Sequence, residues 1–212
     1  MSRISTMFFA TAALLMSALS LLSAAEPTAD KDGWITIFAG KNLDGWKIAE
    51  EDKKSFSLQE GAIVAKGPRS HAFYIGSDKP FKNFEFKAQV MTKENSNGGI
   101  FFHTKFQETD WPKVGHECQV NNTYKSDPQK TGGVYNKAKV LEAPAKDNEW
   151  FNYYIKVEGK RVEVKINDKE VVDYSEGECA DTRCVGEGTF ALQAHDPGST
   201  VFYRNIQVKR LP

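Results

Sequence analysis

The stretch His-Glu-Cys-Gln-Val-Asn at positions 116–121 places one carboxylate and two carboxamides at alternate positions. Successive side chains of a β-strand point to opposite faces, so Glu117, Gln119 and Asn121 would share one face of a strand. A carboxylate can act as a base, and carboxamides both donate and accept hydrogen bonds. The polar face is therefore either a water-facing surface, which is usual for a glutamate on an antiparallel strand, or the floor of a binding cleft.

Two other segments carry polar residues in the same way. Gln193 and His195 share a face opposite to Leu192, and His103 would lie on the same face as Phe101. If these strands are neighbours in one sheet, their carboxamides, imidazoles and flat aromatic rings would suit sugar hydroxyls and sugar ring faces. The structural alternative stays open, because single histidines are more often structural or surface residues.

The roles of two tryptophans and one arginine are also open. Trp111 and Trp150 are candidates for platforms under a sugar ring, or for packing in loops and core. Arg204 shares its parity with Phe202 and Ile206, which suggests a partly buried arginine that holds the fold, as an alternative to a substrate-binding group.

Familiar catalytic motifs are absent from the sequence. It contains no Gly-x-Ser-x-Gly, no His-Glu-x-x-His and no phosphate-binding loop. Conventional hydrolysis of a glycosidic bond uses two carboxylates about 5 to 9 Å apart. Glu117 has only carboxamides as neighbours on its face of the strand, so the second acid is missing there.

Short strands must position these residues. No segment past residue 25 keeps a helical period, and runs rich in Val, Ile, Phe and Tyr are interrupted by Gly, Asp, Asn and Pro. Turns at 158–160 and 167–168 predict a three-stranded meander over 150–174, and the irregular region 105–149 should border the functional face. The fold class predicted is all-β, a two-sheet antiparallel jelly-roll sandwich. The predicted strands are 34–38, 56–59, 62–65, 71–75, 84–91, 99–104, 116–121, 150–158, 161–166, 169–174, 189–195 and 201–209.

The N-terminal segment predicts export. Residues 1–25 read as a signal peptide with an apolar run and small residues before the cleavage point, followed by a linker at 26–33 and a single domain at 34–212. Since Arg3 is the only charged residue among the first 25, the mature chain keeps 27 basic and 28 acidic side chains. This near-neutral balance predicts neither nucleic acid nor a membrane as a partner, and the expected location is periplasmic or secreted.

The three cysteines have different expected roles. In an oxidising compartment, Cys179 and Cys184 can close a short disulfide loop, which is favoured over two free thiols. Cys118, on the opposite face of the strand from Glu117, is predicted to be a small buried hydrophobic residue rather than a nucleophile. The three spacings match no zinc-binding pattern.

Several motifs, taken in order, resemble the 3-keto-disaccharide hydrolase domain family over about residues 34 to 211. No single motif is decisive, but their order and spacing are typical of the family. They are Phe-Ala-Gly-Lys-Asn-Leu-Asp-Gly-Trp at 38–46, Asn-Ser-Asn-Gly-Gly-Ile-Phe-Phe at 95–102, Gly-His-Glu-Cys-Gln at 115–119, Lys-Thr-Gly-Gly-Val-Tyr at 130–135, Leu-Gln-Ala-His-Asp-Pro-Gly at 192–198 and Tyr-Arg-Asn-Ile at 203–206.

The resemblance implies a concanavalin-A-like jelly roll that acts on glycosides whose sugar is oxidised at C3. It places the family's Gly-x-Glu-x-Gln on Glu117 and Gln119, its Thr-Gly-x-x-Tyr on residues 131–135 and its Gln-x-His on Gln193 and His195. The chain departs from the common pattern at two positions, where many relatives have Arg in place of His103 and Asn in place of Phe151.

A ketone at C3 acidifies the proton on C2, so one base is sufficient to start an elimination that expels the C1 substituent, after which water adds. We expect Glu117 to be the base, with His103, Gln119 or His195 as the donor to the enolate oxygen or the leaving group. The substrate-binding residues expected are Asn97, Trp111, Gln119, Lys130, Tyr135, Gln193 and Arg204.

Two alternatives accompany this hypothesis. No cofactor or metal is required, but His103, Glu117 and His195 could instead hold a divalent cation that polarises the ketone. The protein could also be a non-catalytic carbohydrate-binding module, because lectins and hydrolases share this fold.

Overall fold

The structure, a computed structural model, describes residues 27–180 and 182–212; the predicted signal peptide lies outside the described residues. No helix in this part of the chain has the length and apolar character needed to cross a membrane. The elements are β1 (Trp34–Phe38), β2 (Trp46–Ile48), the 3₁₀ turn η1 (Lys53–Ser55), β3 (Phe56–Gln59), β4 (Ala62–Lys66), β5 (Ser70–Tyr74), β6 (Phe84–Thr92), β7 (Gly98–Thr104), β8 (His116–Val120), β9 (Phe151–Glu158), β10 (Arg161–Ile166), β11 (Lys169–Ser175), β12 (Thr189–Ala194) and β13 (Thr200–Arg210).

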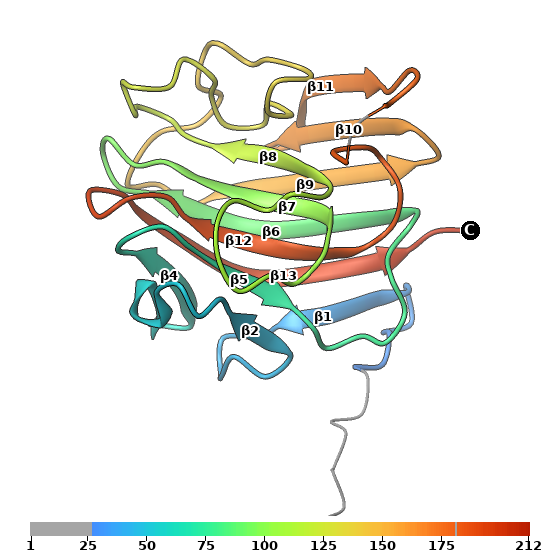
Figure 1. The fold of residues 1–212 in the computed structure, drawn as a ribbon, viewed down its shortest axis with the longest axis horizontal. Coiled ribbons are helices and arrows are strands. Elements are labelled where there is room, and N and C mark those ends of the chain that lie inside the picture. Colours follow the sequence, from blue (N-terminus) through green and yellow to red (C-terminus); the bar gives the residue numbers. More distant parts are fainter. Residues whose placement is uncertain (1–26, 181) are drawn as a thin grey trace, which may run out of the picture.

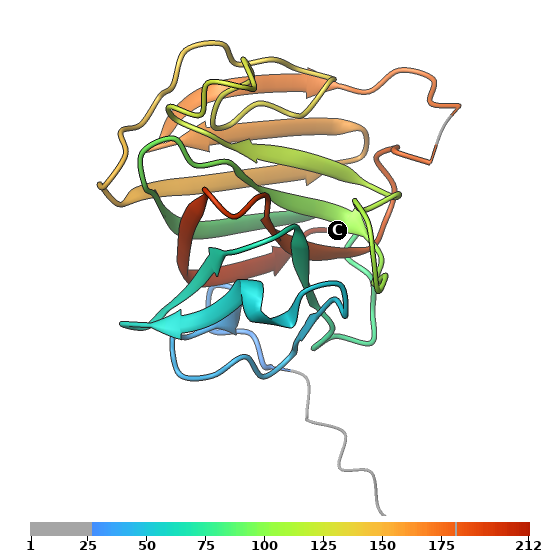
Figure 2. The ribbon, with the colours of Figure 1, turned by 60° about the vertical axis from the view of Figure 1, so that its left-hand side comes forward.

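The strands form two antiparallel sheets, as predicted. The larger sheet has the order β11-β10-β9-β6-β13-β4-β3, and β1 pairs with the second half of β13 beside β4. The smaller sheet has the order β2-β5-β12-β7-β8. Figure 1 shows the smaller sheet lying across the larger one, and the turned view in Figure 2 separates the two layers. The meander predicted over 150–174 is β9-β10-β11.

Alternation of side chains explains the larger sheet. In β6, Phe84, Phe86, Ala88 and Val90 are buried while the residues between them are partly exposed, as the period of two requires. The inward residues of both sheets form one continuous core. Two core tyrosines bind backbone oxygens of the smaller sheet: Tyr153 donates to Gln119 O at 3.0 Å and Tyr203 donates to Gly99 O at 3.4 Å.

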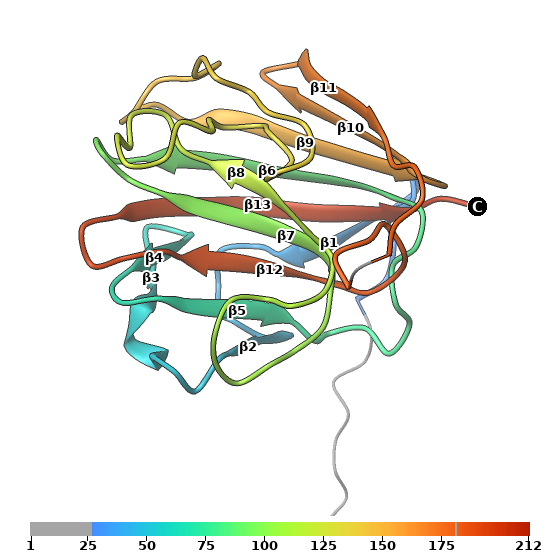
Figure 3. The ribbon, with the colours of Figure 1, turned by 45° about the horizontal axis from the view of Figure 1, so that its top comes forward.

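The smaller sheet is buried on both faces. All residues of β5, β7 and β8 are buried, because loops cover the outer face of this sheet. The β7–β8 loop crosses in front of β5 and β12, and the segment from 121 to 150 gathers beside β8 (Figures 1 and 3). Polar residues on the outer face of this sheet therefore lie in a covered site and not on an open surface.

Two β-bulges alter the side-chain parity that the sequence suggests. In β7, one extra residue lies between the positions that pair with Thr189 and Ala191, and His103 has a φ of +55°. In β13, a register shift follows Arg204, and Asn205 has a φ of +53°. The first bulge turns His103 away from the face of Phe101. The second places Ile206 in the core although Phe202 and Arg204 face outward, so Arg204 does not share a face with Ile206 as its parity suggests.

The cysteines lie as expected. Cys179 and Cys184 form a disulfide, and Cys118 is a fully buried free thiol whose pKa burial raises. The strand β2 was not predicted, and the other strands agree with the expected ranges to within one residue at each end.

Candidate active site

A cavity of about 210 Å³ lies on the outer face of the smaller sheet. Seven of the ten predicted site residues line it: Asn97, Trp111, Glu117, Gln119, Tyr135, Gln193 and His195. Three further lining residues, Phe101, Asp127 and Arg183, were not predicted as site residues.

The floor is built by three adjacent strands. Glu117 and Gln119 come from β8 and Gln193 from β12, on either side of β7. Gly99 of β7 provides the space between them, since a Cβ at this position would lie 2.9 Å from Glu117 Cγ and closer still to Oε1. Across this gap Gln193 Nε2 donates a hydrogen bond to Glu117 Oε1 at 3.0 Å. Glycine at position 99 therefore lets the carboxylate and the carboxamide meet.

Glu117 has the properties of a base. It is only 8% exposed, and burial raises its pKa to about 8, against the opposing effects of the hydrogen bond from Gln193 and the positive charge of Arg183. Its Oε2 has no hydrogen-bond partner among the described residues, so this oxygen is available to a ligand. A carboxylate whose pKa lies near neutral pH is suited to moving protons in both directions.

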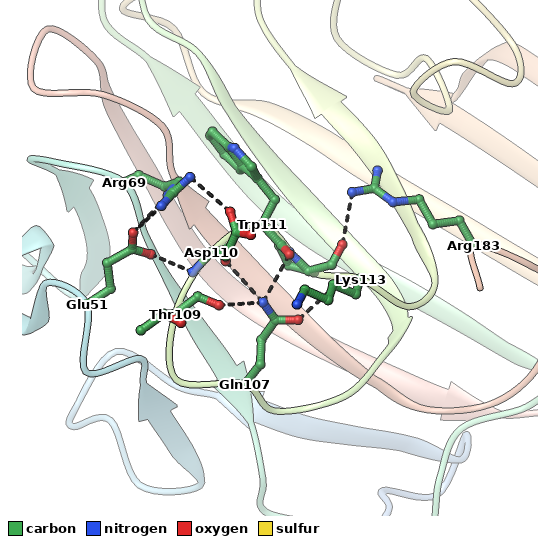
Figure 4. Close-up of polar contacts among 9 residues, drawn as sticks. Glu51, Arg69, Gln107, Thr109, Asp110, Trp111, Lys113 and Arg183 are labelled. Carbon is green, nitrogen blue, oxygen red and sulfur yellow. Dashed lines mark hydrogen bonds and ion pairs between the residues drawn. The ribbon is translucent and has the colours of Figure 1, made fainter. Parts of the chain in front are cut away.

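Trp111 forms one wall of the cavity and is held by a network in its own loop (Figure 4). Arg69 bonds Glu51 and, at 3.0 Å, Asp110. The Gln107 carboxamide donates to three backbone oxygens of residues 109–111 and accepts from Lys113 N at 3.0 Å. These contacts fix the loop, so the Trp111 indole is held at the cavity although the residue belongs to no strand or helix.

His195 lies against Trp111, with ring centroids 5.3 Å apart. Its Nδ1 is 2.8 Å from Asp196 Oδ2, and although burial opposes the shift, hydrogen bonds from His195, Ser199 and the Gly198 amide lower the pKa of Asp196. An ionised Asp196 accepts a hydrogen bond from Nδ1–H of His195, which leaves Nε2 of the ring free to face the cavity.

Loops supply the two charged residues that were missed. Asp127 accepts hydrogen bonds from Gln119 Nε2 at 2.9 Å and from the backbone N–H of Gln129 at 2.8 Å. Arg183 lies inside the disulfide loop and donates to Pro112 O at 3.0 Å. Asp127 falls in the irregular region expected to border the site. Since Asp127 and Arg183 lie in loops, strand alternation could not show from the sequence where their side chains point.

Three expected site residues lie elsewhere. His103 is buried in the core because of the β7 bulge, where it accepts from the Gly186 amide through Nδ1 and bonds Lys82 O through Nε2, and burial lowers its pKa to about 4. Lys130 Nζ donates to Tyr124 O and Asp127 O, so it braces the loop. Arg204 lies on the outer face of the other sheet, 3.8 Å above the Trp150 ring.

The cation site suggested by the sequence is not assembled, because both ring nitrogens of His103 bond backbone groups outside the cavity. Within the described residues, one group of possible metal ligands has its atoms within 4.8 Å, namely Glu176, Cys179 and Cys184. The disulfide leaves no thiolate in that group.

The fold and the pocket define a class, a two-sheet β-sandwich with a site suited to sugars on its smaller sheet. Residues 33–209 match the family model described as 3-keto-alpha-glucoside-1,2-lyase-like domain, and the chain belongs to this family. It is 26% identical over 234 residues to a 3-keto-disaccharide hydrolase from Bacteroides thetaiotaomicron, covering 86% of this chain and 80% of the relative.

Solved structures agree on the fold. A candidate glycosyl hydrolase from Parabacteroides distasonis superposes with a TM-score of 0.70 at 23% identity, covering 85% of this chain and 95% of the other. The carbohydrate-binding module CBM66 from Bacillus subtilis gives a TM-score of 0.55 at 14% identity, covering 78% and 95%. A galectin-like protein from the same species is also similar, so the fold is the concanavalin- and galectin-like sandwich.

Proposed function

We propose that this protein cleaves the glycosidic bond of 3-keto-glycosides by elimination followed by hydration, with Glu117 as the base. A carbohydrate-active role is supported by the family and by the curated relative named as a 3-keto-disaccharide hydrolase. The observation that carries the proposal is the environment of Glu117, a buried carboxylate with a pKa of about 8 and one oxygen open to a ligand.

The reaction balances with one carboxylate. Glu117 takes the proton from C2, and the electrons of that bond form an enolate with the C3 oxygen. The enolate then returns to a ketone as a C1–C2 double bond forms and the C1–O bond breaks, and the leaving oxygen takes a proton. Water adds to C1 and a proton returns to C2, so the net change is hydrolysis.

Other lining groups fit the remaining needs of this reaction. His195, Tyr135 and Arg183 can donate hydrogen bonds to the enolate oxygen or to the leaving oxygen. Burial raises the pKa of Tyr135, which keeps its hydroxyl protonated as a donor. Asn97, Gln119 and Gln193 add carboxamide groups to the lining, and carboxamides can both donate to and accept from sugar hydroxyls.

Export is part of the proposal. It is supported by the signal-peptide pattern of residues 1–25 and by the disulfide, since disulfides persist in oxidising compartments. Sequencing the N-terminus of the exported protein should find Glu26 first; a mature chain that retains residues 1–25 would contradict cleavage at this point.

The decisive experiment uses a 3-keto-glucoside with a chromogenic leaving group in D₂O. Elimination should release the chromophore and leave deuterium at C2 of the sugar product, whereas direct displacement at C1 leaves C2 unlabelled. Release without deuterium at C2, and without a kinetic isotope effect for a substrate that carries deuterium at C2, would reject the mechanism. Sugar binding without release would instead favour the carbohydrate-binding module.

A further inference from the structure

A second cavity of about 230 Å³ lies beside the first. The two share Glu117, Tyr135 and Arg183 as lining residues, so the base lies in the boundary between them. The remaining lining residues of the second cavity are Gly115, His116, Asn136 and Lys137. It therefore extends past β8 along the segment that follows Thr131, away from Trp111 and His195.

Size indicates that the two cavities act together. Small-molecule sites usually occupy roughly 300–1,000 Å³. Each cavity alone is smaller than this range, at about 210 and 230 Å³, and the pair taken together falls within it. A ligand of two linked units would fill both cavities and pass directly over Glu117.

The two cavities differ in chemistry. The first is lined by the Phe101 and Trp111 rings and by the carboxamide side chains of Asn97, Gln119 and Gln193, which match the faces and hydroxyls of one sugar held in a fixed orientation. The second is lined by no Phe or Trp, its rings are the shared Tyr135 and the buried imidazole of His116, and its outer wall is formed by the exposed polar residues Asn136 and Lys137. Such a wall is suited to a hydrated, hydroxyl-rich group with less stringent recognition.

We propose that the second cavity binds the leaving group, a second sugar or a similar hydroxyl-rich aglycone, while the first binds the 3-keto sugar. This inference rests on the proposed function, since C2 and the bond broken at C1 must both lie next to Glu117. With this orientation, Tyr135 and Arg183 flank the C1–O bond, and His195 is on the side of the oxidised ring.

The test compares two substrates that differ only in the leaving group, a 3-keto-disaccharide and 3-keto-glucosyl fluoride, whose fluoride needs no second cavity. Lys137→Trp fills the second cavity, and Lys139→Trp is the matched control, because Lys139 is an exposed lysine of the same segment outside both cavities. Lys137→Trp should lower kcat/KM for the disaccharide at least about tenfold and leave the fluoride within about twofold.

Equal losses for both substrates, or no loss for either, would overturn the inference. If Lys137→Trp does not fold, Lys137→Cys is assayed before and after labelling with a bulky maleimide, since Cys118 is fully buried and should not react. A wild-type protein that turns over neither substrate would reject the proposed function itself.

Discussion

Glu117→Gln is the substitution that examines the site most directly. Glutamine keeps the shape of the side chain and can still accept the hydrogen bond from Gln193, but it can neither take a proton nor ionise. A general base typically contributes 10²- to 10⁴-fold, so kcat should fall by roughly this factor. In the wild type, kcat/KM should rise with pH and level off above about 8, because the carboxylate is the active form.

The same substitution should stabilise the protein at alkaline pH. The pKa of Glu117 is about 8 in the folded protein and 4.5 is its ordinary value, so the unfolded chain ionises first as the pH rises. Each pH unit in this window lowers the wild-type free energy of unfolding by up to about 1.4 kcal/mol. Glutamine has no such loss. The free energy of unfolding of Glu117→Gln relative to wild type should therefore increase by about 4 kcal/mol between pH 5 and 9.

Urea unfolding at pH 5, 7 and 9 measures this difference. Glu142→Gln, a substitution of an exposed loop glutamate, is the control and should show no comparable dependence on pH. Two results would refute the reasoning: a Glu117→Gln protein that retains wild-type turnover, or a stability difference that stays constant across the pH range. The first result would show that Glu117 is not the base. The second would show that burial does not raise the pKa of this carboxyl.

Two further substitutions probe how Glu117 is positioned, and a third tests that His103 lies outside the site. Gln193→Met removes the donor that lowers the pKa of Glu117, so the midpoint of the pH profile of kcat/KM should move above about 8, and an unchanged midpoint would contradict the contact. Gly99→Ala should displace the carboxylate and reduce kcat/KM by about 10² while circular dichroism still reports a folded protein; full activity would show that the close approach is unimportant. His103→Leu should cost about 2 kcal/mol in urea unfolding through two lost hydrogen bonds and leave the pH midpoint in place, whereas a shifted midpoint would return this residue to the site.

The regular part of the fold can be read from the sequence because its strands alternate cleanly. Phe84 to Val90 and Tyr153 to Val157 place every second residue in the core, and the structure has this pattern. The same period of two predicts that Glu117 shares a face with Gln119 and that Gln193 shares a face with His195. All four residues line the cavity. The strand β2 was missed because three residues are too few to show a period.

Parity fails where the backbone departs from the regular pleat. His103 and Asn205 adopt positive φ angles at bulges, and neither residue type identifies such a position by itself. As a result His103 turns into the core, and Arg204 faces outward with Phe202 while Ile206 faces the core. Loop residues are still harder to place, since Arg183 reaches the cavity through the disulfide loop and its contact with Pro112, neither of which follows from strand periodicity.

Asp127 changes the reason for preferring elimination. Within the strand of Glu117 the second acid of a conventional glycosidase is missing, but the folded pocket contains one from a loop. Both oxygens of Asp127 already accept hydrogen bonds, one from the Gln119 side chain and one from the backbone N–H of Gln129. Glu117 Oε2, in contrast, has no hydrogen-bond partner among the described residues. A general acid or a nucleophile must present an oxygen to the substrate. Since Glu117 does so and Asp127 is engaged in holding Gln119, the arrangement suits a reaction that needs one carboxylate.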